Sequence, residues 1–190
     1  NFEIDSGYLD YTWNWGGYRN CAPLTSVLPT PRVNACISQS PLSVKKSFAD
    51  NLYLNIMPRR KESANASDWI KNYSEMSVAL KQCAALKKQF LPHFTEGTLI
   101  GDCILSEPSP GAHIAAYVRP KQALVVVINE GAPRKIDLSC ELSPWLGEGS
   151  KRIVKCFNAD GRLISEKKIS RSNWRGQTPK LQTGEMMVFE

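Results

Sequence analysis

The sequence predicts an α/β region followed by an all-β region. Up to about residue 97, apolar residues follow strand-like and helix-like spacings in turn, and beyond it they follow strand spacing only. Short strand-like segments then recur between turn residues, which is typical of an antiparallel β-sandwich. The expected domains are an incomplete α/β portion over residues 1–96 and a complete β-sandwich over residues 97–190.

Composition and charge narrow the possible classes. The 190 residues are 42% hydrophobic and 22% charged, which is typical of a globular chain and excludes collagen, a coiled coil and a wholly disordered chain. No apolar run reaches the roughly 18 residues of a transmembrane helix, so we expect no membrane partner. The net charge of +6 is spread along the chain rather than clustered, so we expect no nucleic-acid partner.

The first expected element is a strand over Phe2–Asp5, whose period of two places Glu3 and Asp5 on one face. Residues 6–39 follow without a regular pattern. A loop of this length in a compact domain is often functional. It contains several aromatic residues, namely Tyr8, Tyr11, Trp13, Trp15 and Tyr18.

Two helices and one strand complete the α/β portion. Ser40 and Pro41 have the residue types of a helix cap and first turn, and predict a short helix to about Ala49. A strand over residues 51–57 follows. A second helix begins at Ser74, carries an apolar stripe from Met76 to Phe90, and is expected to stop at Pro92.

The remainder of the chain reads as strands. The alternation over residues 135–142 indicates a half-buried antiparallel strand, the run Ala123–Ile128 indicates a buried one, and Asp160-Gly161 indicates a hairpin turn. The expected strands are 98–105, 112–119, 123–130, 135–142, 151–158, 162–170 and 184–190.

The α/β portion is expected to be incomplete. Its strand–helix order predicts parallel strands joined by crossover helices. Two parallel strands alone leave their faces uncovered, so the rest of a sheet or barrel is required. The chain also begins without Met, and we therefore expect it to be the end of a longer protein.

Cysteine and histidine give no sign of a metal or cofactor site. The six Cys include no CxxC pair, and there are only two His. Most of the Cys are expected to be buried small hydrophobic residues. The alternative for Cys21 and Cys36 is a disulfide, which would require an oxidising compartment. We expect no cofactor and no metal.

One segment carries a family resemblance. Leu86-Lys-Lys-Gln-Phe-Leu-Pro-His-Phe94, followed by Thr98-Leu-Ile-Gly-Asp102, resembles the last helix and the start of the C-terminal sandwich in β/α-barrel glycoside hydrolases. Thr183–Glu190 resembles the closing strand of that sandwich. The resemblance implies that the chain is the last two strand–helix units of a β/α barrel plus a C-terminal antiparallel β-sandwich, with Phe2–Asp5 as the seventh barrel strand and Leu52–Met57 as the eighth.

The resemblance also implies a function, the hydrolysis of glycosidic bonds in a carbohydrate substrate. Such enzymes use two carboxylates at the carboxyl ends of barrel strands. Asp5 and Glu3 are the candidate catalytic residues here, and the second carboxylate is expected from an earlier strand. The implied partner is therefore the N-terminal barrel portion of the same polypeptide, and the fragment alone is expected to be inactive. The alternative for Glu3 and Asp5 is a solvent-facing carboxylate pair.

Four residues are candidates for substrate binding. The rings of Tyr11, Trp13 and Trp15 suit stacking on sugars, and Arg59 follows the proposed eighth strand, where its guanidinium suits hydroxyls or a carboxylate. The alternatives are aromatic rings packed into their own loop and an Arg59 salt bridge.

The alternative function is a non-catalytic carbohydrate-binding or interaction module. Trp145 and Trp174, expected in loops of the β portion, would then be the binding aromatics. The sequence does not determine the cellular compartment, although it favours a secreted or periplasmic location.

Overall fold

The computed structural model describes residues 12–14, 33–38, 40–51, 54–56, 74–147, 152–169 and 173–190. The chain divides into two compact units, unit 1 (Asn1–Cys83) and unit 2 (Ala84–Glu190). The domain boundary expected between residues 96 and 97 stays a prediction.

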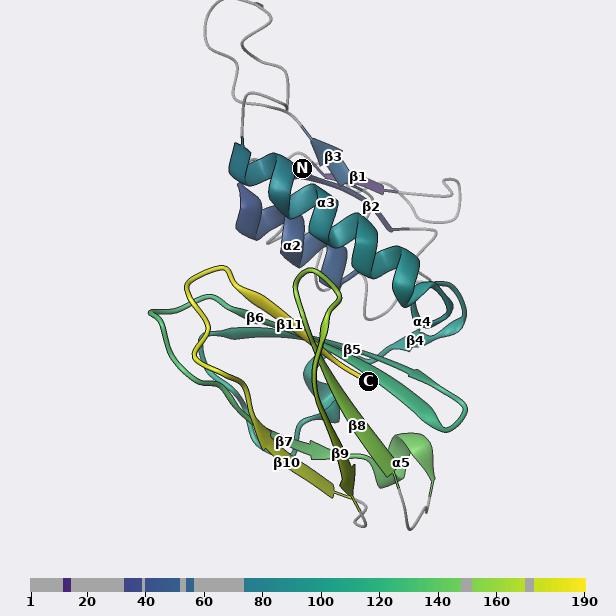
Figure 1. Ribbon diagram of the computed structural model, residues 1–190. Helices are drawn as coiled ribbons and strands as arrows, with labels where there is room; N and C mark the ends of the chain where they lie inside the picture. The colour runs from purple at the N-terminus through teal and green to yellow at the C-terminus, as the bar shows by residue number, and fades with distance from the viewer. Residues whose placement is uncertain are drawn as a thin grey trace, which may run out of the picture. The chain divides into compact units, whose positions relative to one another are not determined.

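Unit 1 contains a parallel three-stranded sheet in the order β1-β2-β3 (Figure 1). β1 (Thr12–Asn14) pairs with β2 (Val33–Ser38), and β2 pairs with β3 (Leu54–Ile56). The expectation of parallel strands is confirmed. The expectation that residues 6–39 lack regular structure is wrong, because β1 and β2 lie there; β1 has only 3 residues, too few to show a period.

Helix α2 (Pro41–Ala49) connects the parallel strands β2 and β3, and its start is as predicted. The Ser40 hydroxyl accepts a hydrogen bond from the Ser43 amide, while the Ser43 hydroxyl accepts one from the Ser40 amide, both at 3.1 Å. This capping box satisfies two backbone donors at the helix start. Val44 and Phe48 are buried on one face of the helix.

Helix α3 (Ser74–Gln89) begins at the predicted Ser74, and its predicted apolar stripe is buried. Its end differs from the prediction: Pro92 does not stop it but lies in the first turn of the next helix, α4 (Leu91–Glu96). Proline fits this position because the first turn does not need its missing N–H group. Among the described residues, no helix has the length and apolar character needed to cross a membrane.

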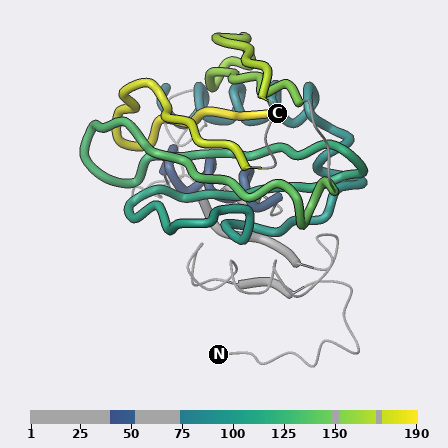
Figure 2. Tube along the Cα trace, turned by 90° about the horizontal axis from the view of Figure 1, so that it is seen from below, coloured from purple at the N-terminus to yellow at the C-terminus, as the bar shows by residue number. Residues whose placement is uncertain are grey.

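Unit 2 consists mainly of two antiparallel sheets, which can be followed from teal to yellow in Figure 2. The larger sheet has six strands in the order β4-β5-β6-β11-β8-β9, and the smaller pairs β7 with β10. The strands are β4 (Thr98–Leu99), β5 (Ala112–Arg119), β6 (Gln122–Asn129), β7 (Asp137–Glu141), β8 (Arg152–Asn158), β9 (Leu163–Ile169), β10 (Asn173–Gln177) and β11 (Met186–Phe189).

Six of the seven strands expected in this region are found close to their predicted places, and one is mostly wrong. Of the expected strand 98–105, only Thr98–Leu99 is a strand, because Gly101 takes a positive φ of 60° and the short 3₁₀ helix η5 (Gly101–Ile104) follows. β10 was not expected, since only Trp174 is apolar enough to mark a strand there.

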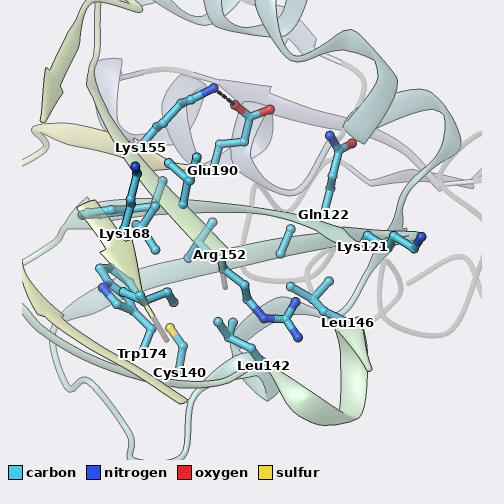
Figure 3. Close-up of a pocket in the computed structure, with 16 residues that line it drawn as sticks. Lys121, Gln122, Cys140, Leu142, Leu146, Arg152, Lys155, Lys168, Trp174 and Glu190 are labelled. Atoms are coloured by element: carbon cyan, nitrogen blue, oxygen red, sulfur yellow. Dashed lines mark ion pairs between the residues drawn. The ribbon is translucent and has the colours of Figure 1, made fainter. Parts of the chain in front are cut away.

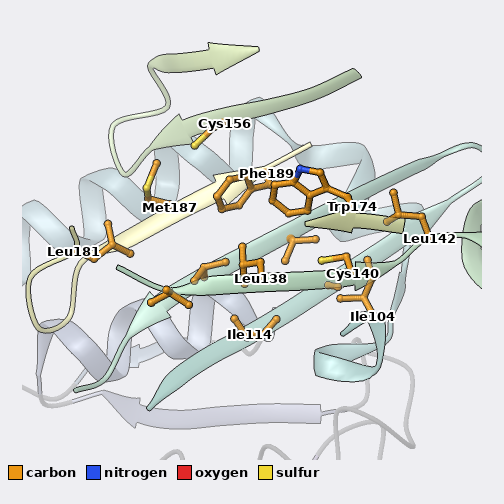
Figure 4. Close-up of a cluster of buried hydrophobic side chains, with 14 residues drawn as sticks. Ile104, Ile114, Leu138, Cys140, Leu142, Cys156, Trp174, Leu181, Met187 and Phe189 are labelled. Atoms are coloured by element: carbon orange, nitrogen blue, oxygen red, sulfur yellow. The ribbon is translucent and has the colours of Figure 1, made fainter. Parts of the chain in front are cut away.

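A hydrophobic cluster lies between the two sheets (Figure 4). The smaller sheet contributes Leu138, Cys140 and Trp174. The larger sheet contributes alternate residues of its central strands: Ile114, Ala116, Val125, Val127, Cys156, Met187 and Phe189. The two sheets therefore form two layers over one core.

The opposite face of the larger sheet is buried as well. The ring of Phe94 in α4 lies 4.8 Å from that of Tyr117 in β5. The ring of Phe90, just before α4, lies 5.1 Å from that of Phe157 in β8. The central strand β6 is thus covered on both faces, which accounts for its uninterrupted apolar run Ala123–Ile128.

Candidate functional site

Neither of the two predicted catalytic residues lies among the described residues. Glu3, Asp5, Tyr11, Trp15 and Arg59 lie outside the described residues. A sixth candidate, Trp13, is placed only by its backbone, in strand β1. The catalytic and substrate-binding assignments therefore stay predictions.

The two tryptophans of the β portion do not lie in loops, so that expectation is wrong. Trp145 lies in the short helix α5 (Ser143–Leu146), and Trp174 lies in β10. Trp174 is 8% exposed, and its ring centroid lies 5.1 Å from that of Phe189. Gly176 lies against the same indole, since a Cβ there would come within 2.3 Å of it. Trp174 is therefore a core residue with little surface to offer a sugar.

Unit 2 contains an open hollow of about 1180 Å³ beside this tryptophan (Figure 3). Its lining residues come from β6, β7, β8, β9, β10, β11, α5 and the residues next to them. Its apolar lining is mostly aliphatic and comprises Ala123, Val125, Leu142, Leu146, Ile153, Val154 and Ile169, with Cys140, Trp174 and Phe189.

The polar lining of the hollow is mainly cationic. Lys121, Arg152, Lys155 and Lys168 line it, against one carboxylate, Glu190. Lys155 and Glu190 form an ion pair with Nζ and Oε2 3.9 Å apart (Figure 3). The other three cations exceed the negative charge of the lining.

Arg152 is the most constrained of these cations. Its Nη2 donates to the carbonyl oxygen of Gly147, the residue that ends α5, at 2.5 Å. Its Nε is buried, and no acceptor among the described residues lies within hydrogen-bond distance. In Figure 3 the guanidinium reaches toward Leu142 and Leu146. A buried N–H donor without an acceptor costs free energy, so this group is suited to an incoming anion.

Sequence reasoning missed Arg152, although the sequence contains a signal for it. Arg152, Val154 and Cys156 alternate along β8, and the latter two pack into or against the core cluster. Arg152 itself is half-buried, and a cation that continues an inward-facing row of apolar residues is a signal for a functional site.

His93 is a second buried polar group. It is 3% exposed in α4, and its Nε2 has no partner among the described residues. Burial lowers the pKa of His93, Glu190 opposes this shift, and Arg119 adds to it. His93 is therefore held neutral, in keeping with a structural role.

The described thiols are poor nucleophiles and poor metal ligands. Burial raises the pKa of both Cys83 and Cys140 to about 12, and that of Cys156 to about 11. The expectation of buried small hydrophobic residues is confirmed for these three, whereas Cys103 is exposed. Within the described ranges, no group of three or more His, Cys, Asp or Glu side chains is arranged to hold a metal ion.

Solved structures share this fold. No protein-family model matches the chain, and no curated protein matches it. A GH30 endoxylanase from Clostridium papyrosolvens matches 93% of the chain at 12% sequence identity with a TM-score of 0.50. A noncanonic maltogenic α-amylase, AmyB from Thermotoga neapolitana, matches 94% of it at 9% identity with a TM-score of 0.50.

These matches cover both units of the chain but only part of each counterpart. The chain spans 47% of the endoxylanase structure and 51% of the amylase structure, about half of each. Identities this low show a shared fold. The chain therefore shares its fold with about half of each of these two structures.

Proposed function

We propose that the chain is the C-terminal portion of a β/α-barrel glycoside hydrolase, in which it takes part in the hydrolysis of glycosidic bonds. The observation that supports this most is the order of the two units: a parallel β2–α2–β3 unit is followed by α3 and then by antiparallel sheets. The GH30 endoxylanase and the maltogenic α-amylase share this fold over 93% and 94% of the chain.

The sheet of unit 1 supports the need for a further barrel portion. Parallel sheets occur almost only with both faces covered by helices, or closed into a barrel. The sheet described for unit 1 has three strands, with β1 and β3 at its edges. We propose that barrel strands supplied by the rest of the polypeptide pair with these edges, and that unit 2 is the accessory β-sandwich.

The barrel proposal changes the numbering of the strands. β3 falls within the segment expected to be the eighth strand, and β2 precedes it in the chain and pairs with it directly. We therefore propose β2 as the seventh strand of such a barrel. This assignment replaces the expectation that Phe2–Asp5 is the seventh strand. Glu3 and Asp5 precede β1 in the chain. A catalytic role for them therefore requires that they follow the carboxyl end of an earlier barrel strand, where the catalytic groups of such barrels lie.

The proposed catalytic role is tested by two isosteric substitutions. In the protein at its natural length, Glu3→Gln or Asp5→Asn is expected to lower kcat for glycoside hydrolysis by about 10²–10⁴-fold, the usual contribution of one acid or base group. Glu166→Gln, on the exposed strand β9, is the matched control and is expected to leave kcat unchanged. Unchanged rates in both Glu3→Gln and Asp5→Asn would remove the catalytic assignment.

The proposed binding role of the aromatic segment has a separate test. Substitution of Trp13 or Trp15 by Ala is expected to raise KM for an oligosaccharide about tenfold or more, because each indole offers a large stacking surface. Trp145→Ala, in α5 of unit 2, is the control, and its KM is expected to stay at the wild-type value. An unchanged KM in both test variants would contradict the assignment.

A further inference from the structure

We propose that the hollow of unit 2 binds an anionic amphiphile, a molecule with an aliphatic chain and a carboxylate head group. The inference stands apart from the proposed hydrolase function. All residues that line the hollow belong to unit 2, and none is a proposed catalytic residue.

Charge complementarity favours an anion. Four cations and one carboxylate line the hollow, and the carboxylate of Glu190 is paired with Lys155. Arg152, Lys121 and Lys168 remain as an excess of positive charge around a partly enclosed space. Clefts lined by one sign of charge concentrate ligands of the opposite sign.

Arg152 supplies the specific contact. The hydrogen bond to Gly147 fixes one end of its guanidinium, and its buried Nε–H has no acceptor among the described residues. A carboxylate can accept from Nε and from a neighbouring terminal N–H at once, in the bidentate geometry that arginine favours. A carboxylate placed there would satisfy the unpaired donor.

The rest of the lining favours an aliphatic body over a sugar. Sugar sites present exposed aromatic faces and several polar side chains, whereas the apolar lining here is mostly Val, Leu, Ile and Ala. The one tryptophan here is 8% exposed and is covered by Phe189 and Gly176. The volume of about 1180 Å³ is ample for a chain of ten carbons, since pockets for drug-sized ligands measure roughly 300–1000 Å³.

The test is a titration of the 190-residue chain with three probes that share a ten-carbon tail, all below their micellar concentrations. The probes are decanoate, decyl maltoside and decyltrimethylammonium, and binding is measured by calorimetry. Decanoate is expected to bind at least about tenfold more tightly than the other two, because a charge-assisted hydrogen bond contributes about that factor. Shortening the acid to octanoate is expected to weaken binding about threefold to fourfold per methylene removed.

Two matched arginine variants locate the site. Arg152→Met is expected to weaken decanoate binding about tenfold or more, since it removes the guanidinium and keeps an apolar side chain of similar length. Arg162→Met, at an exposed arginine outside the hollow, is the control and is expected to bind as the wild type does. Lys168→Gln removes a second cation of the lining and is also expected to weaken decanoate binding. This variant tests the recognition of the carboxylate head group if Arg152→Met lowers the melting temperature.

Several outcomes would overturn the proposal. They are equal binding of decanoate and decyl maltoside, absence of decanoate binding, or equal affinity in wild type, Arg152→Met and Lys168→Gln. Binding of an acidic oligosaccharide such as a galacturonate oligomer, without binding of decanoate, would show that the hollow recognises a charged sugar. That result would overturn the proposal that its ligand has an aliphatic chain.

Discussion

Single residues in unit 2 show how closely its core is packed around Trp174. The indole lies across Gly176 of the same strand and against Phe189 of the facing sheet. The two residues are two positions apart in β10, so their side chains emerge on the same face of the strand. The absence of a side chain at Gly176 is what leaves room for the ring.

Gly176→Ala is therefore expected to destabilise unit 2 by about 1–3 kcal/mol, the usual cost of overpacking a core. The new Cβ would come within 2.3 Å of the indole, and Phe189 limits where the ring can go. Urea unfolding followed by tryptophan fluorescence measures this effect. Gly131→Ala is the control, because a Cβ there meets its nearest atoms at 3.8 Å; equal stability of both variants would contradict the account.

His93 predicts a pH dependence of stability. Burial lowers its pKa in the folded state below the ordinary 6.5, so the unfolded chain takes up a proton first as the pH falls. This contribution to stability is complete above pH 6.5 and decreases as the pH falls from 6.5 through the folded-state pKa. His93→Gln is expected to remove this component from urea unfolding curves measured across that range, and an identical pH dependence in variant and wild type would contradict it.

At the scale of elements, local chemistry fixes where helix α2 begins. Ser40→Ala removes the acceptor of the Ser43 amide and is expected to destabilise unit 1 by about 1 kcal/mol. Ser40→Asp keeps an acceptor at this position and is expected to restore most of the loss. Helix content and urea unfolding of the protein at its natural length measure both variants, and equal effects of Ala and Asp would show that the cap contributes little.

The elements that could be predicted are those with a long period or a clear cap. The starts of α2 and α3, the alternation of β7 and the Asp160-Gly161 turn between β8 and β9 were all recognisable from the sequence. β1 and β10 could not be recognised, because one has only 3 residues and the other has one buried side chain. Their pairing partners, not their own residues, make them strands.

At the scale of the whole chain, the order of elements predicted the parallel pairing and the later antiparallel sheets. It could not predict the hollow, because its lining comes from elements that are far apart in the sequence and meet only in the folded chain. The candidate site residues were chosen from residue type and position along the chain. Of the six proposed for catalysis and substrate binding, only Trp13 has its backbone described.

The two units are expected to differ in independent stability. Unit 2 has a core shared by two sheets and helices on the other face, so residues 84–190 alone are expected to unfold cooperatively in urea. Residues 1–83 alone are expected to give no cooperative transition, because a parallel sheet requires cover on both faces. Cooperative unfolding of residues 1–83 alone would contradict the view that unit 1 is a portion of a larger barrel.

The most direct test of the central claim is a crystal structure of the protein at its natural length with a bound oligosaccharide. The account predicts that β1, β2 and β3 are consecutive strands of a closed β/α barrel and that the sugar lies at their carboxyl ends. An open sheet that ends at β1 or β3, or a sugar bound only to unit 2, would contradict it.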